Sequence, residues 1–226
     1  MFHPMPSRLP IFPLGVVLFP TTPLPLHIFE PRYRRMLADC LAADKSFGIT
    51  PVGADGELPE PGAVGCVAEV RVNQELPDGR SNIVVVGGAR FVLTKVLDEP
   101  VPYHVAMVQV FEDQPGTEPA EDRTERLREL FTSYLGLLRQ LNDLQAEESR
   151  LPDAVADLTF HAAAAAECDA SIKRRLLAER SVTKRVEALL LLLPLLTRSL
   201  ERALEVHQRS HSNGRGTAHP DLLAGS

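Results

Sequence analysis

Few residues in this sequence have the types and spacing that metal binding requires. His207 and His211 lie four positions apart, as in a helical metal-binding pair, but they stand in a polar stretch without a partner carboxylate. His161 and Cys168 lie seven positions apart in an alanine-rich stretch and could share one face of a helix. Ordinary packing and solvation explain both pairs, and we predict no metal site.

The sequence also lacks the motifs of common nucleotide-binding and hydrolytic sites. Gly87-Gly88-Ala89-Arg90 precedes strand-forming residues, whereas a phosphate-binding loop would continue into Lys-Ser/Thr and a helix. Neither the G-x-S-x-G pattern of serine hydrolases nor the H-E-x-x-H pattern of zinc proteases occurs. We therefore predict no catalytic residue and no cofactor, and we expect that the chain is not an enzyme.

Composition narrows the class of protein and its partners. The 226 residues carry a net charge of −6 and are 44% hydrophobic, which is ordinary for one large globular domain or two small ones. The acidic balance argues against nonspecific binding to nucleic acid or to an anionic membrane. We therefore expect neither as a partner.

The cysteines and the apolar stretches suggest a cytoplasmic protein. Cys40, Cys66 and Cys168 are widely spaced and odd in number, which favours reduced thiols over a disulfide or zinc framework. The N-terminal residues do not resemble a signal peptide. The most apolar stretch, Leu189–Leu196, is far shorter than the roughly 20 residues that span a bilayer.

The residues best suited to bind a ligand lie in one proline-rich stretch, FPTTPLPLHIFEPRYRRML, at positions 19–37. Pro20, Pro23 and Pro25 cannot lie inside a helix and favour an extended edge strand. Pro31 precedes apolar residues at helical spacing. It therefore predicts the start of a helix that covers about residues 31–43.

Side chains at this strand-to-helix junction suggest a structural hinge and a binding rim. Glu30 is expected to cap the helix and to pair with Arg32 or Arg90, so that Glu30, Pro31 and Arg90 form the hinge. His27 alternates with apolar neighbours and therefore faces the other side of its strand. The candidates for contact with a peptide are Pro25, His27, Phe29, Arg32 and Arg35.

These side chains must be positioned by a first half that is rich in strands. Up to about residue 113 the sequence predicts short strands, the helix at about 31–43 and a Pro-Asp-Gly hairpin turn within residues 76–80. Many short strands suggest a barrel or a sandwich in which the helix plugs one end. The expected strands cover residues 11–12, 16–19, 24–29, 47–52, 64–72, 82–86, 91–96 and 104–111.

After residues 111–119, a segment that contains Pro and Gly, the spacing of apolar residues changes to that of an amphipathic helix. A seam of apolar residues predicts a helix of about 25 residues that contains Leu127, Leu130, Tyr134, Leu137, Leu141 and Leu144. Further helices are predicted at 158–167 and after an N-cap at Ser181, the last one kinked or split at Pro194. We predict a strand domain over 1–113, a helical domain over 119–207 and a disordered tail over 208–226.

Residues 9–37, LPIFPLGVVLFPTTPLPLHIFEPRYRRML, resemble the entry signature of the Lon N-terminal domain family, the substrate-binding region of ATP-dependent Lon proteases. The similarity continues through Phe47-Gly48-Ile49, through residues 65–70 with the hairpin that follows, and through residues 85–91. The resemblance implies an α+β fold. It would consist of an N-terminal PUA-like β pseudobarrel with one embedded helix, followed by a C-terminal α-helical bundle.

Two parts of a Lon protease have no counterpart in this sequence: the ATPase module with its phosphate-binding loop and the protease module with its Ser–Lys dyad. The sequence therefore resembles a stand-alone bacterial substrate-binding-domain protein. The resemblance implies a non-catalytic polypeptide-binding or adaptor module. The implied partners are unfolded or extended polypeptide segments, together with a protease or a chaperone.

The sequence is compatible with two binding surfaces. One is a barrel rim near Phe12, Phe19, Pro25 and Phe29, and the other is the groove between the barrel and the bundle. Two other functions stay open: RNA or small-molecule binding through the PUA-like barrel, and a cryptic hydrolase, which the missing motifs disfavour. Neither the client nor the oligomeric state is predicted.

Overall fold

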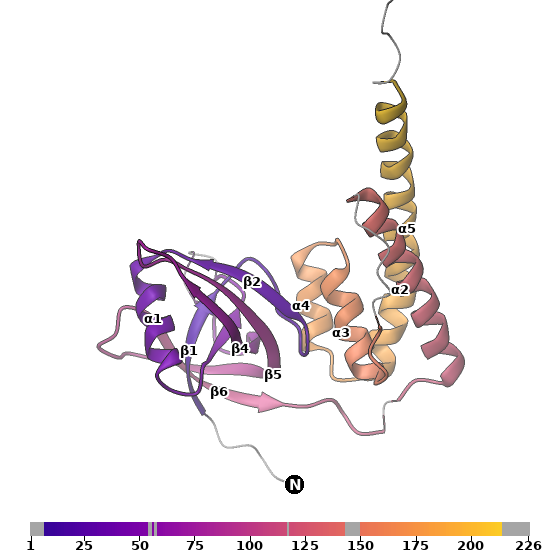
Figure 1. The fold of residues 1–226 in the computed structure, drawn as a ribbon. Coiled ribbons are helices and arrows are strands. Elements are labelled where there is room, and N and C mark those ends of the chain that lie inside the picture. The colour runs from indigo at the N-terminus through magenta and orange to yellow at the C-terminus, as the bar shows by residue number, and fades with distance from the viewer. Residues whose placement is uncertain (1–6, 54–55, 57, 117, 143–149, 214–226) are drawn as a thin grey trace, which may run out of the picture.

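The first half of the chain forms a sheet that closes on itself (Figure 1). The computed structural model describes residues 7–53, 56, 58–116, 118–142 and 150–213. Its strand order is β2-β5-β4-β3-β1-β6, and an additional pairing of β6 with β5 closes all but β2 into a ring. The strands are β1 (Ser7–Pro13), β2 (Pro23–Ile28), β3 (Ser46–Thr50), β4 (Val64–Glu75), β5 (Ser81–Leu97) and β6 (His104–Phe111). We call this sheet and helix α1 (Pro31–Leu41) the barrel.

Strand β5 corrects the sequence prediction, which placed two strands at 82–86 and 91–96. The strand is continuous across Gly87 and Gly88, and the absence of a side chain at Gly87 lets another part of the chain pack closely against it. A Cβ atom on Gly87 would lie 1.9 Å from the carbonyl oxygen of Phe19. Glycine inside a strand often marks such a close backbone approach. Residues 16–19, which were expected to form a strand, instead form an irregular segment that leads to this contact.

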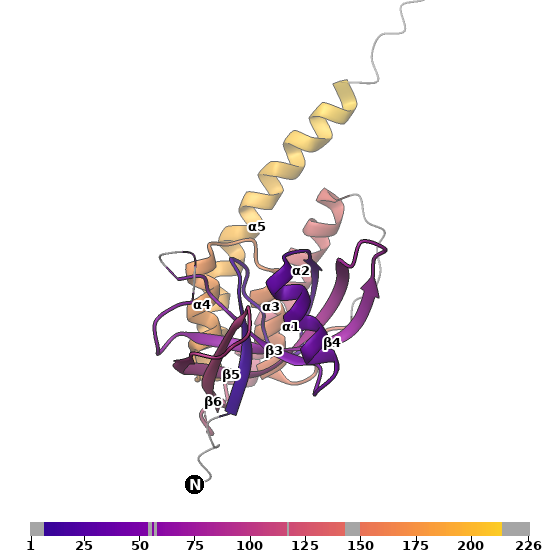
Figure 2. The ribbon, with the colours of Figure 1, turned by 90° about the vertical axis from the view of Figure 1, so that its left-hand side faces the viewer.

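Helix α1 begins at Pro31, as the sequence predicted. Its apolar stripe (Tyr33, Met36, Leu37 and Cys40) is buried in the barrel. Figures 1 and 2 show that α1 lies on the side of the barrel that faces away from the other helices. The residues proposed for a binding rim at the start of α1 are therefore remote from the groove between the two halves.

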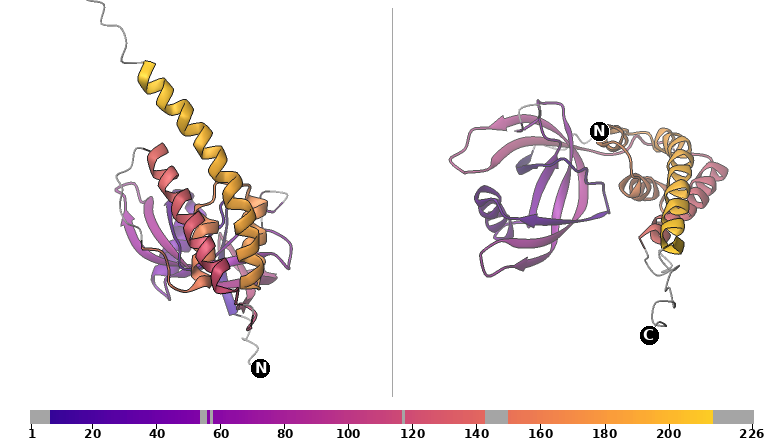
Figure 3. Two further views of the ribbon diagram at one scale, coloured as in Figure 1. Left: turned by 90° about the vertical axis from the view of Figure 1, so that its right-hand side faces the viewer. Right: turned by 90° about the horizontal axis from the view of Figure 1, so that it is seen from above.

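The second half of the chain consists of helices that stand beside the barrel (Figures 1 and 3). They are α2 (Glu121–Leu141), α3 (Val155–Ala165), α4 (Ala170–Ala178) and α5 (Val182–Asn213). The seam of α2 buries Leu127, Phe131 and Tyr134. One hydrophobic core runs through both halves, and Phe19 of the barrel packs against Phe160 of α3 at a ring-centroid distance of 6.2 Å. We call α2 to α5 the helical half.

The helices differ from the prediction in three places. Helix α4 was not predicted separately. Helix α5 runs unbroken through Pro194, so the predicted split is wrong. Leu189 and Leu193 before the proline and Leu200 after it are buried, and this tertiary packing favours a continuous helix. The helix also continues past Gln208, where a disordered tail was expected to begin, to Asn213. Leu144 and residues 214–226 lie outside the described residues.

A buried cluster of charges joins the two halves. Arg90 on β5 donates hydrogen bonds to the carboxylate of Asp113 and to the carbonyl oxygens of Leu177 and Glu179, the latter two at 3.0 and 2.8 Å. Arg185 on α5 donates to both carboxylate oxygens of Asp113, at 2.6 and 2.7 Å. The side chains of Arg90 and Arg185 are only 4% and 1% exposed. We call Arg90, Asp113 and Arg185 the latch.

The latch shows that the predicted pairing of Arg90 with Glu30 is wrong. The guanidinium of Arg90 lies over the rings of Phe111 and Phe160, with its Cζ atom 4.7 and 5.1 Å from the ring centroids. These contacts and its hydrogen bonds hold the side chain against the helical half. Arg90 therefore stabilises the junction of the two halves and takes no part in a hinge at α1.

Candidate binding site between the barrel and the helical half

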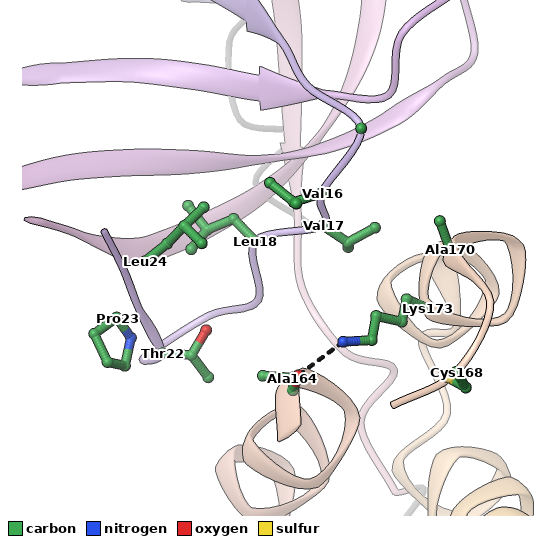
Figure 4. A pocket seen from close by; sticks show the side chains of 11 residues that line it. Val16, Val17, Leu18, Thr22, Pro23, Leu24, Ala164, Cys168, Ala170 and Lys173 are labelled. Atoms are coloured by element: carbon green, nitrogen blue, oxygen red, sulfur yellow. Dashed lines mark hydrogen bonds between the residues drawn. The ribbon is translucent and has the colours of Figure 1, made fainter. Parts of the chain in front are cut away.

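A pocket of about 300 Å³ lies where the barrel faces α3 and α4 (Figure 4). One wall comes from the segment 15–24 of the barrel, and the other from the C-terminal end of α3 and the first turns of α4. Most of the lining atoms belong to apolar side chains. The lining residues are Gly15, Val16, Val17, Leu18, Thr22, Pro23, Leu24, Ala164, Cys168, Ala170 and Lys173.

The barrel wall of this pocket is fixed by backbone contacts with β5. The N–H of Thr21 donates to the carbonyl of Gly87 at 2.8 Å, and the N–H of Gly87 donates to the carbonyl of Thr22 at 3.0 Å. The hydroxyl of Thr22 donates to the carbonyl of Phe19 at 2.8 Å. Phe19 is fully buried and anchors the segment, whereas the Val16 side chain is 50% exposed. Val16 is thus an apolar residue held at the mouth of the pocket.

The helical wall is fixed by two helix termini. Asp169 caps α4 by accepting a hydrogen bond from the N–H of Ser171 at 2.8 Å. Lys173, one turn into α4, donates through Nζ to the carbonyl of Ala164 in the last turn of α3, at 2.8 Å (Figure 4). A cation near the C-terminal end of a helix interacts favourably with the helix dipole. The pocket is therefore formed by rigid elements on both sides.

The chemistry of the lining suits binding better than catalysis. Burial raises the pKa of the Cys168 thiol, so the thiol stays protonated and is a poor nucleophile. Neither a histidine nor a carboxylate lines the pocket to activate it. Burial lowers the pKa of Lys173, the one ionisable group of the lining besides the thiol. The pocket offers apolar contact and one cation.

The predicted rim residues lie elsewhere on the barrel. Pro25 and His27 are on the exposed face of β2, and Phe29, just after the strand, is 58% exposed. The His27 ring stacks on that of Phe29 at a centroid distance of 6.0 Å, and His27 Nδ1 is 2.7 Å from Asn82 Oδ1. The structure thus brings Pro25, His27 and Phe29 together. Phe12, which was expected nearby, is in the core with Phe19 because both rings pack against other aromatic side chains.

The charged rim residues form local ion pairs. Glu30 occupies the N-cap position of α1 but accepts no capping hydrogen bond through its side chain, so its predicted role as a side-chain cap is wrong. Its carboxylate instead accepts from Arg32 Nε at 3.0 Å, which is one of the two pairings predicted. Arg35 donates to Asp39 one turn later, also at 3.0 Å. Exposed pairs of this kind contribute about 0–1 kcal/mol.

Prolines make the free edge of β2 a poor site for strand addition. β2 pairs with β5 alone among the described strands, in a register that runs from Pro23–Val86 to Ile28–Ser81. Pro23 and Pro25 have no N–H to donate to β5, so the backbone groups of these two residues point toward the free edge of β2. An added strand would therefore miss two donors. The missing donors make the β2 edge less suited than the pocket to hold a peptide.

Sequence reasoning missed most residues of the pocket and two of the three latch residues, Asp113 and Arg185. Arg185 could have been found, because it shares the buried stripe of α5 with Val182, Val186 and Leu189. Lys173 gave no such signal, since α4 was not predicted and a lone lysine is usually solvated. Of the pair considered from the sequence, His161 lies on α3 and Cys168 lies just before α4. Burial lowers the pKa of His161, and a hydrogen bond with the backbone of Thr21 acts in the opposite direction.

Solved structures that share this fold include two Lon N-terminal domains. The crystal structure of a Lon N-terminal domain protein from Xanthomonas campestris has a TM-score of 0.63 and 22% sequence identity, and covers 81% of this chain and 97% of its own. The N-terminal domain of Lon protease from Mycobacterium avium complex has a TM-score of 0.61 and 17% identity, and covers 83% of this chain and 98% of its own. The architecture is that of Lon N-terminal domains.

The chain belongs to the family of the ATP-dependent protease La (LON) substrate-binding domain, whose sequence model matches residues 8–194. Lon protease from Flavobacterium johnsoniae is 27% identical over 161 residues, which are 69% of this chain and 18% of that protein. Lon protease from Parabacteroides distasonis is 30% identical over 134 residues, which are 57% of this chain and 16% of that protein. The chain thus spans less than a fifth of the length of these relatives.

Two further observations limit what the site can be. Within the described part of the chain, no group of three or more His, Cys, Asp or Glu side chains could hold a metal ion. Over the same residues, none of the helices combines the length and the apolar character that crossing a membrane would require. The side chains of His207 and His211 lie outside the described residues.

Proposed function

We propose that this domain binds extended or unfolded polypeptide segments, without catalysis, in the pocket between the barrel and the helical half. Membership of the Lon substrate-binding family supports substrate recognition as the general task. The observation that carries the specific proposal is an apolar pocket of about 300 Å³ between rigid walls, with Val16 exposed at its mouth. Bound segments would be presented to a protease or a chaperone.

The pocket has the size and polarity for a peptide side chain. Its volume is at the lower end of the range of about 300–1,000 Å³ that is typical of ligand sites. It can therefore take one or two apolar side chains of an unfolded segment, which a folded protein would keep in its core. Each square ångström of apolar surface removed from water contributes about 25 cal/mol. Recognition of exposed apolar residues would distinguish unfolded from folded chains.

A substitution at the mouth of the pocket tests this proposal. Val16→Glu places a hydrated carboxylate where the apolar side chain of a client would enter. We expect that it weakens the binding of an unfolded, fluorescently labelled polypeptide at least about tenfold, measured by fluorescence anisotropy. Because Val16 is half exposed, the stability should change by no more than about 0.5 kcal/mol.

Two control variants make the result specific. Val72 is exposed to a similar extent, 54%, on β4 and does not line the pocket, so Val72→Glu should leave affinity unchanged. Arg35→Glu tests the rim and should also bind like the wild type. A loss of affinity in Arg35→Glu together with normal binding by Val16→Glu would place the binding surface at the rim and reject the pocket.

A further inference from the structure

Lys173 holds its charge in an apolar setting without a counter-ion. Its Nζ atom donates to the carbonyl oxygen of Ala164 and lies within ion-pair distance of no carboxylate among the described residues. Burial lowers the pKa of Lys173, and it acts more strongly than the nearby Cys168 and Glu167, which favour the protonated form. A half-buried ammonium that lacks an anionic partner is costly to keep unless a ligand supplies one.

The geometry leaves Lys173 free to bind such a ligand. An ammonium group has three N–H donors, and the carbonyl of Ala164 takes one of them. Figure 4 shows the Lys173 side chain extending from α4 across the pocket toward the end of α3, with Val17 on the facing wall. The lining around this cation is mostly apolar and contains no carboxylate, so an anion that enters the pocket meets one charged donor, while Glu167 lies outside the lining.

We infer that the pocket recognises a carboxylate that is adjacent to an apolar side chain, and that Lys173 binds the carboxylate. This inference rests on the proposed function of the pocket and adds the chemistry of the preferred segment. The apolar side chain would fill the space between Val16, Leu24 and Ala170, and the carboxylate would accept a hydrogen bond from Nζ. Two sources carry this chemistry: the free C-terminus of a polypeptide, and an internal Asp or Glu next to an apolar residue.

Binding measured with three labelled peptides tests the inference. The first is an unstructured peptide that ends in Leu-Leu with a free carboxylate, the second is the same peptide with an amidated end, and the third is amidated but has Asp beside an internal Leu. We expect that the wild type binds the first peptide about tenfold more tightly than the second, because a charge-assisted hydrogen bond is lost on amidation. Tight binding of the third peptide assigns the preference to carboxylates in general, and weak binding assigns it to the C-terminus.

Two variants separate recognition from stability. Lys173→Met keeps the apolar stem and removes the charge, so it should bind the free-acid and amidated peptides equally, at the affinity of the wild type for the amide. Lys184→Met removes one charge from an exposed position on α5 outside the pocket and should keep the tenfold preference. A role of Lys173 that is limited to capping α3 would lower the melting temperature of Lys173→Met but leave the preference unchanged.

The outcomes distinguish this inference from the function on which it rests. Equal affinity of the wild type for the free-acid and amidated peptides would overturn the carboxylate preference and leave peptide binding intact. Failure of the wild type to bind any of the three peptides would overturn both. The comparison of peptides on the wild type needs no variant and therefore stays valid even if Lys173→Met does not fold.

Discussion

Asp113→Ala should lower the free energy of unfolding by about 3–5 kcal/mol, measured by chemical denaturation. Among the described residues, Asp113 is the only carboxylate that pairs with Arg90 and Arg185, so the substitution leaves two nearly inaccessible guanidinium groups without a counter-charge. Removing one partner of a buried charge network costs the desolvation of the groups that remain. Because the latch connects the halves, the loss should also separate their unfolding transitions, which we expect to coincide in the wild type.

A matched control and a pH series support this test. Glu125, an exposed acid on α2, should give a change within about 0.5 kcal/mol when replaced by alanine.

Burial raises the pKa of Asp113, but the hydrogen bonds and charges of Arg185 and Arg90 outweigh burial and lower it below the usual value. The contribution of Asp113 to stability is therefore full above the unfolded pKa of about 4 and is lost as the pH falls through the lower folded value. Wild-type stability of Asp113→Ala would show that the latch does not stabilise the fold.

Gly87→Ala is expected to cost about 3 kcal/mol and to weaken peptide binding at the same time. The new Cβ atom would lie 1.9 Å from the carbonyl oxygen of Phe19 and 3.1 Å from the backbone nitrogen of Pro20, so the segment 19–22 must move away from β5. This segment leads into the barrel wall of the pocket. Thermal melting and anisotropy with an unfolded peptide measure the two effects.

The neighbouring glycine supplies the control. A Cβ atom on Gly88 would approach the flexible end of Glu69 at 3.1 Å and meet Val67 at ordinary contact distances of 3.6 and 3.7 Å, so Gly88→Ala should stay within about 1 kcal/mol of the wild type and bind normally. If both substitutions had the same effect, Gly87 would matter only as a glycine within a strand. That result would contradict the idea that the contact between Gly87 and residues 19–22 shapes the pocket.

Features that depend on neighbours in the sequence were predictable. Pro31 begins α1 because a proline at the first helical position lacks only an N–H that would have no partner in the helix. Ser181 precedes α5, and its hydroxyl accepts from the N–H of Lys184 at 3.3 Å. Strand β6 has the bounds that were predicted for it, His104–Phe111. Membership of the Lon substrate-binding family followed from a long local motif.

Features that depend on contacts between distant segments were not predictable. Gly87 sits inside a strand because residues 19–22 pack on it, and the local sequence alone indicated a break. Arg90 was considered as a partner of Glu30, but the fold places it against Asp113 and the end of α4. The pocket combines residues 15–24 with residues 164–173, and nothing in the sequence of either segment indicates that the two meet.

Amide hydrogen exchange, recorded with and without a saturating unfolded peptide, tests most directly whether the pocket is the binding surface. Exchange should slow in residues 15–22 and 164–173, which form the two walls, because the bound peptide shields them. Residues 27–35, which carry the rim, should exchange at the same rate in both samples. Slowed exchange in residues 27–35 with no change in residues 15–22 and 164–173 would contradict binding in the pocket and locate the peptide on the rim.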